Sequence, residues 1–137
     1  MNHPVPETTV AEAEASLGRA QTANPNFIPQ FYETFMGKRD AFSKMFTNVD
    51  MVHQYARLYN GLIKLFEYAR NPAPETLSLL AKIHSRKHVG VKPAYYFDWL
   101  DALLGTLKSC DPKFDSSVAE HWIATLMPGI EYLKAQY

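Results

Sequence analysis

One predicted helical face of this chain carries a histidine among leucines. Leu77, Leu80 and His84 fall at positions i, i+3 and i+7, so they share one side of a helix, and that side is otherwise apolar. An imidazole in this setting is either a core residue with a satisfied hydrogen bond or a ligand presented from an apolar wall. The periodicity leaves both interpretations open and makes His84 the main candidate for chemistry.

Other kinds of site find no support in the sequence. It contains no glycine-rich phosphate loop, no Cys/His pairing with zinc-binding spacing and no credible Ser-His-Asp set. The single cysteine, Cys110, excludes an internal disulfide and suits a reducing compartment. We interpret Cys110 as a small, partly buried residue near a turn.

Charge and composition narrow the possible partners. The length of 137 residues fits one domain with a real core, and fourteen basic residues cancel fourteen acidic ones. Because there is no basic surplus, we expect neither a nucleic acid nor a membrane partner. No signal peptide or membrane-spanning apolar run is present, so the sequence predicts a cytoplasmic protein.

The elements that must position His84 are all predicted to be helices, since no alternating strand pattern of useful length occurs. Residues 1–8 are expected to form a flexible tail and residues 9–137 one domain. A hydroxyl of Thr8 or Thr9 would cap the first helix, Asp50 or Asn48 the fourth, and Asp115 or Ser116 the last. The expected helices cover about residues 10–21, 27–37, 42–46, 51–69, 77–88, 93–110 and 116–136.

With the helices placed in this order, the chain resembles a single-domain bacterial globin, similar to the globin domain of flavohaemoglobins. The resemblance spans about Val10 to Tyr132 and implies an all-α globin fold of six to seven helices, three packed over three. Each motif is weak by itself, but their order and spacing together are fairly specific. The matching pieces are Phe31-Tyr32, Phe46 fourteen residues after Tyr32, Gln54-x-x-x-Leu58, His84, and Tyr96-x-x-x-x-Asp101-x-Leu103-Leu104.

The resemblance implies haem b as cofactor, with His84 as the proximal ligand of the iron. His88, one turn later on the same predicted face, is the alternative ligand. Leucines stand four and seven residues before His84, as is usual in globin proximal helices, whereas His84 and Ala81 take those places before His88. We expect the second ring nitrogen of His84 to bond a backbone carbonyl near Leu80.

The same resemblance assigns the remaining site residues. Tyr32 corresponds to a tyrosine whose hydroxyl donates to the bound gas ligand, and Gln54 takes the distal helix position if Leu58 is the pocket aliphatic. His53 is the alternative distal residue, although choosing it would place Arg57 in the pocket at a high desolvation cost. The residues expected to line the haem are Phe46, Met51, Leu58, Leu80, Val89, Val91, Tyr96 and Leu103.

One departure from flavohaemoglobins concerns the proximal side. There, the tyrosine matching Tyr96 lies below the haem and helps to tie the proximal histidine, together with a glutamate on the last helix. Here the position matching that glutamate falls near Tyr137, and Glu131 lies more than a turn too early. This puts a strongly electron-pushing proximal ligand in doubt. The flavin and nicotinamide domain of flavohaemoglobins is absent, so reduction would need an external reductase.

The function that these residues favour is reversible oxygen binding and transport, with nitric oxide as a further gas ligand. The alternatives are a nitric oxide dioxygenase served by an external reductase, a haem-based gas or redox sensor, and a haem-free helical protein in which His84 is a core residue. We expect either a monomer or a homodimer.

Overall fold

The computed structural model describes residues 3–137, which form seven α-helices and no strand. The expectation of an all-α chain with six to seven helices is confirmed. In this part of the chain no helix is both long and apolar enough to cross a membrane. The helices are α1 (Glu7–Ala23), α2 (Phe27–Met36), α3 (Asp40–Met45), α4 (Met51–Arg70), α5 (Pro74–His84), α6 (Tyr95–Cys110) and α7 (Ser116–Ala135).

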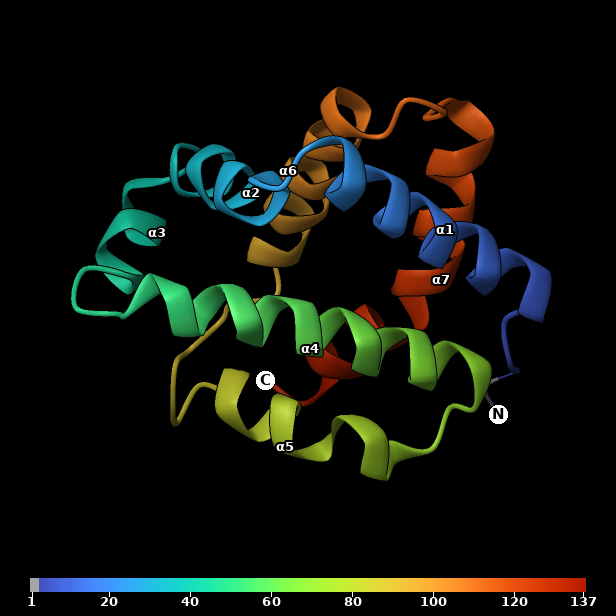
Figure 1. The fold of residues 1–137 in the computed structure, drawn as a ribbon. Helices are drawn as coiled ribbons and strands as arrows, with labels where there is room; N and C mark the ends of the chain where they lie inside the picture. The colour runs from blue at the N-terminus through green and yellow to red at the C-terminus, as the bar shows by residue number, and fades with distance from the viewer. Residues whose placement is uncertain (1–2) are drawn as a thin grey trace.

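The helices pack in crossing pairs around one core. Figure 1 shows α4 and α5 lying side by side, with α7 crossing behind α4. Helix α1 packs mainly against α7, and α2 packs against α6. The short helix α3 lies near the start of α4. Aromatic side chains from three helices, Phe31, Phe66 and Trp122, are almost completely buried in the core. Helix α2 contacts both α6 and α4, and α4 contacts α5, so these four helices carry the predicted site residues.

The first helix begins earlier than the sequence predicts. It starts at Glu7, without a cap from Thr8 or Thr9, and the carbonyl of Pro6 accepts the backbone N–H groups of Thr9 and Val10 at 3.0 and 3.2 Å. Residues 7 and 8 therefore belong to the helix rather than to the expected tail. Residues 1 and 2 of that tail lie outside the described residues.

The helix that carries His84 also differs, at both ends. It begins at Pro74, whose fixed φ suits the first turn, and it ends at His84 rather than at His88. The chain then folds back, because Gly90 adopts a φ of 73°, a left-handed conformation that favours glycine. The N–H of Val91 consequently donates to the carbonyl of His84 at 2.9 Å. The expectation that His88 lies on the same helical face was wrong.

Two helix starts follow the sequence prediction closely. The side chain of Asp50 accepts the N–H of Val52 at the start of α4, and Asp115 accepts the N–H of Val118 at the start of α7. Aspartate at the N-cap satisfies a backbone donor that has no partner within the helix. These caps fix where α4 and α7 begin.

A buried ion pair fixes α1 to the turn between α6 and α7. The carboxylate of Asp111 has no exposed surface and accepts hydrogen bonds from Arg19 and Ser16, the shortest at 2.7 Å. Burial alone raises the pKa of Asp111, but the bonds from Arg19, Ser16 and the backbone of Lys113 outweigh it and hold the pKa below its ordinary value. The carboxylate thus stays charged and anchors this end of the fold.

The close approach of α4, α5 and α7 requires glycine at position 129. A Cβ there would lie 3.3 Å from Cδ1 of Leu77 and closer still to Cδ2 of Leu65. We expect Gly129→Ala to lower the free energy of unfolding by about 1–3 kcal/mol, because overpacking forces neighbouring side chains to move. Urea denaturation measures the change.

The matched control is Gly105→Ala, in the exposed middle of α6. An added Cβ at Gly105 meets no atom within 4 Å, so the higher helix propensity of alanine should keep or raise the stability by up to about 1 kcal/mol. Equal stability of the two variants would show that the packing at Gly129 is loose.

Candidate functional site

His84 stands at the last position of α5, where the helix leaves the core. Its ring is half-buried, and its Nδ1 lies 3.1 Å from the hydroxyl of Tyr96. Burial lowers the pKa of His84, so the imidazole is neutral at neutral pH. Its Nε2 makes no hydrogen bond within residues 3–137. The structure therefore presents a neutral imidazole held at one nitrogen and free at the other.

Tyr96 comes from the first turn of α6 and is buried. Burial raises the pKa of its phenol, so the hydroxyl remains protonated and uncharged. The bond to Tyr96 agrees with the contact that the resemblance implied for this tyrosine, whereas the expected bond to a carbonyl near Leu80 was wrong. The helix α5 ends at His84, so its imidazole can reach across to α6 instead of back along its own helix.

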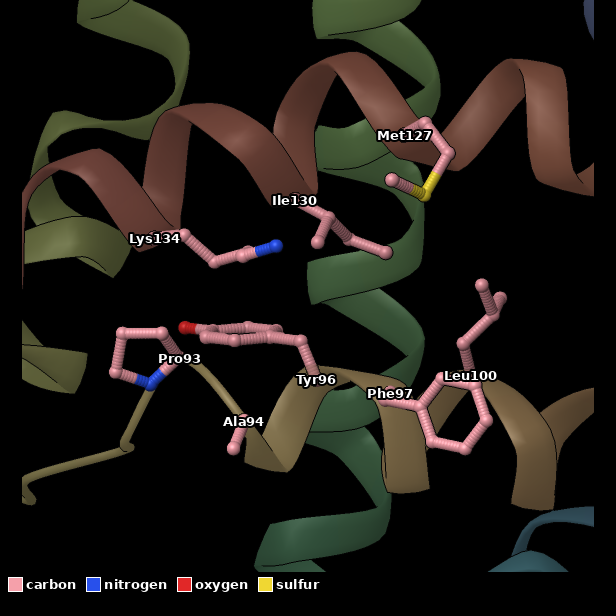
Figure 2. Close-up of a pocket in the computed structure, with 8 residues that line it drawn as sticks. All are labelled: Pro93, Ala94, Tyr96, Phe97, Leu100, Met127, Ile130 and Lys134. Atoms are coloured by element: carbon pink, nitrogen blue, oxygen red, sulfur yellow. The ribbon is translucent and has the colours of Figure 1, made fainter.

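On its other side, the ring of Tyr96 forms part of an open groove between α6 and α7. Figure 2 shows the ring below Lys134 and Ile130 of α7, with Pro93 at its hydroxyl end. The groove has a volume of about 320 Å³ and is mainly apolar. Glu131 is exposed and pairs with Lys134, so it does not reach Tyr96. The partner of His84 is thus a neutral phenol, and the carboxylate of Glu131 does not contact it.

A second polar pair joins α2 to α4. The hydroxyl of Tyr32 is buried and accepts a hydrogen bond from the amide nitrogen of Gln54 at 3.0 Å. Burial raises the pKa of Tyr32 to about 12, so its hydroxyl keeps its proton. The ring of Phe46, which follows α3, meets the Tyr32 ring edge-on at 5.5 Å between centroids. These side chains form one compact cluster.

The orientation of Gln54 depends on a residue that the sequence prediction did not assign to the site. Arg57 donates to the amide oxygen of Gln54 at 3.3 Å, so the amide nitrogen faces Tyr32. The only signal for Arg57 was its i+3 spacing from Gln54. By contrast, His53 is 72% exposed, and its Nδ1 lies 3.3 Å from the carboxylate of Asp50.

The predicted lining residues divide into two kinds. Leu58, Tyr96 and Leu103 are buried, whereas the others retain exposed apolar surface. Those that are half-buried against the core are Phe46, Met51, Leu80 and Val91. These partly uncovered apolar side chains come from the turn after α3, from α4, from α5 and from the turn after α5, and they could pack against an apolar group.

The structure brings some predicted residues together and separates others. Tyr32, Phe46 and Gln54 form one group, and His84, Val91 and Tyr96 form another. Three other candidates are exposed: His53 and His88 face solvent, and Val89 is 48% exposed in the turn after α5.

The donor set limits the kind of metal centre that the chain could hold. Across residues 3–137, no three His, Cys, Asp or Glu side chains gather as in an all-protein metal site. A metal bound to His84 would need its other ligands from a non-protein group. Haem fits this requirement, because its macrocycle surrounds the iron and the protein adds a single neutral imidazole. The free Nε2 of His84 and the half-buried apolar side chains are consistent with that group.

Comparison with known proteins gives one informative similarity. No family model and no curated protein matches the chain. A solved structure does match, that of protein PA3967 from Pseudomonas aeruginosa PAO1, which is described as structurally highly homologous to a human hemoglobin. The TM-score is 0.90 at 29% sequence identity, over 94% of this chain and 98% of the other.

Proposed function

Since this chain is a globin-like protein, we propose that it holds haem b through His84 and binds molecular oxygen reversibly, with nitric oxide as a second ligand. The observation that carries the proposal is the state of His84: neutral, held at Nδ1 by Tyr96, and free at Nε2. When bound, haem supplies a ferrous iron with an open position for a diatomic gas.

The proximal residues would hold the imidazole in one tautomer. Ligation through Nε2 requires the proton on Nδ1, so His84 donates to the hydroxyl oxygen of Tyr96. Because Tyr96 is an uncharged acceptor, the imidazole keeps its proton and gains little anionic character. This favours oxygen binding over chemistry that needs an electron-rich proximal ligand.

The distal residues would supply a hydrogen bond to the bound gas. Gln54 donates to the lone pair of the Tyr32 hydroxyl, and the hydroxyl proton makes only a long bond of 3.5 Å to the backbone carbonyl of Gln54. A ligand that carries partial negative charge would take that proton in place of the carbonyl. The raised pKa of Tyr32 keeps that proton in place over the physiological range. A donor fixed in a partly buried site stabilises such a ligand more than one in water.

Titration of the purified protein with haem b, followed by absorption spectroscopy, tests the proposal. We expect a Soret band that saturates at one haem per chain, and a shift of that band when the reduced sample meets carbon monoxide or oxygen. A chain that leaves haem unbound would instead be a globin-like protein in which His84 is a core residue.

A further inference from the structure

The turn between α5 and α6 concentrates positive charge in a chain whose net charge is zero. No Asp or Glu occurs between Glu75 and Asp98, and the turn region contains four of the fourteen basic residues. We call this surface the basic corner and define it by the exposed side chains of Lys82, Arg86, Lys87, His88 and Lys92.

The cations of the basic corner lack carboxylate partners. Within the described part of the chain, the ion pairs join Arg19, Lys38, Arg39, Lys64, Arg70, Lys134 and His53 to acidic residues, and none includes the basic corner. Two of its cations rest on aromatic rings, Arg86 over Tyr137 at 5.1 Å and Lys92 over Tyr95 at 6.0 Å. Rings hold these cations in place without cancelling their charge.

Exposed aliphatic side chains lie among the basic residues of the basic corner. Ile83 is 44% and Val89 is 48% exposed, and a backbone hydrogen bond of 3.0 Å from Val89 to Ile83 holds the two residues next to each other. Leu79, one turn earlier on α5, is 70% exposed. An apolar centre with a charged rim is the usual anatomy of a protein-protein interface.

The basic corner also lies directly beside His84. It begins at Lys82, and the N–H of Val91 donates to the carbonyl of His84 at 2.9 Å. In Figure 1 the segment forms the outer corner where the chain passes from α5 to α6. A protein bound there would stand near the proximal histidine.

We propose that the basic corner is the docking surface for an acidic electron-carrier protein that holds an iron–sulfur cluster. This inference rests on the proposed function, because only ferrous haem binds oxygen and a ferric site needs an electron. The carrier gives up one electron and is oxidised, and that electron reduces the ferric iron to ferrous. Charge complementarity would raise the association rate and make it depend on salt.

The aliphatic and aromatic content of the basic corner favours a protein over an anionic membrane. A helix that binds a membrane surface combines its basic side with a broad, continuous apolar face rich in Trp, Phe or Leu. Here only three aliphatic side chains are exposed, Leu79 and Ile83 on α5 and Val89 in the turn after it. The rings of Tyr95 and Tyr137 lie under Lys92 and Arg86 and are only half-exposed. Anionic vesicles therefore serve as the competing ligand in the test.

The experiment compares two variants with the same change in net charge. Lys82→Glu/Lys87→Glu/Lys92→Glu reverses the basic corner, and Lys44→Glu/Lys108→Glu/Lys113→Glu reverses three exposed lysines elsewhere. Binding to a purified plant-type [2Fe–2S] ferredoxin is measured by fluorescence anisotropy at low and at physiological salt, with haem-loaded protein. We expect the first variant to weaken binding by about tenfold or more, and the second to weaken it much less.

The outcomes separate the docking surface from the haem proposal. Equal weakening by both variants, no binding by the wild type at low salt, or preferential binding to phosphatidylserine vesicles would each overturn the docking surface. The Soret band is recorded on the same samples. Haem uptake without ferredoxin binding overturns the docking surface alone. A chain that takes up no haem overturns the proposed function, and the electron-carrier role of the basic corner fails with it.

Discussion

Replacing His84 by alanine is expected to abolish stable haem binding. The imidazole of His84 is the one protein group that we assign to the iron. Because loss of even an outer partner of a metal ligand costs ten- to a hundredfold in affinity, loss of the ligand itself should weaken haem binding by more than about a hundredfold. Haem transfer to apomyoglobin, followed at the Soret band, measures the change.

His88→Ala is the matched control, because His88 is exposed and lies outside α5. That variant should bind haem like the wild type. Tyr96→Phe should fall between the two, since it removes the acceptor of the Nδ1 proton but keeps the ligand. Added imidazole should restore the Soret band of the His84→Ala protein. Loss of haem in His88→Ala with retention in His84→Ala would move the proximal assignment to His88.

Replacing Tyr32 by phenylalanine is expected to speed oxygen release by roughly tenfold to a hundredfold. The change keeps the ring that packs against Phe46 and removes only the hydroxyl. A hydrogen bond to a partly charged ligand contributes about 1–3 kcal/mol, which corresponds to that range of rates. Stopped-flow measurement of oxygen displacement gives the dissociation rate constant.

Two controls show whether the effect comes from the hydroxyl. Carbon monoxide carries little partial charge when bound, so its release should change far less in Tyr32→Phe. Gln54→Ala removes the donor that orients the Tyr32 hydroxyl and should also speed oxygen release, whereas His53→Ala should leave it unchanged because His53 faces solvent. An unchanged oxygen rate in Tyr32→Phe, or a large effect in His53→Ala, would contradict the distal assignment.

The sequence predicted the helices well because their signals are local. The apolar period of the segment 51–69 and the caps at Asp50 and Asp115 depend on residues within a turn of one another. The end of α5 was wrong because it is set by a contact across the turn. Val91 bonds the carbonyl of His84, and Gly90 supplies the left-handed conformation that this reversal needs.

The candidate site likewise combines residues that local signals identify with contacts that only the packing of helices determines. The sequence marked Tyr32, Gln54 and His84 by type and order. It left open whether His53 or Gln54 turns toward α2, since adjacent residues differ by about 100° around a helix and only packing fixes the rotation. It offered two partners for His84, a carbonyl near Leu80 and, through the resemblance, Tyr96, and the structure supplies the hydroxyl of Tyr96. Such a contact depends on how α5 and α6 meet.

The sequence by itself thus determined an all-α chain, the positions of its helices and the residue types available for a site, because each of these follows from short-range periodicity and turn chemistry. Only the tertiary structure decided which nitrogen of His84 is free, which side chain faces Tyr32, and where α5 stops. The sequence also contains the cluster of basic residues around the turn after His84. Only the tertiary structure shows that these cations have no carboxylate partners among the described residues, because ion pairs can join residues that are distant along the chain.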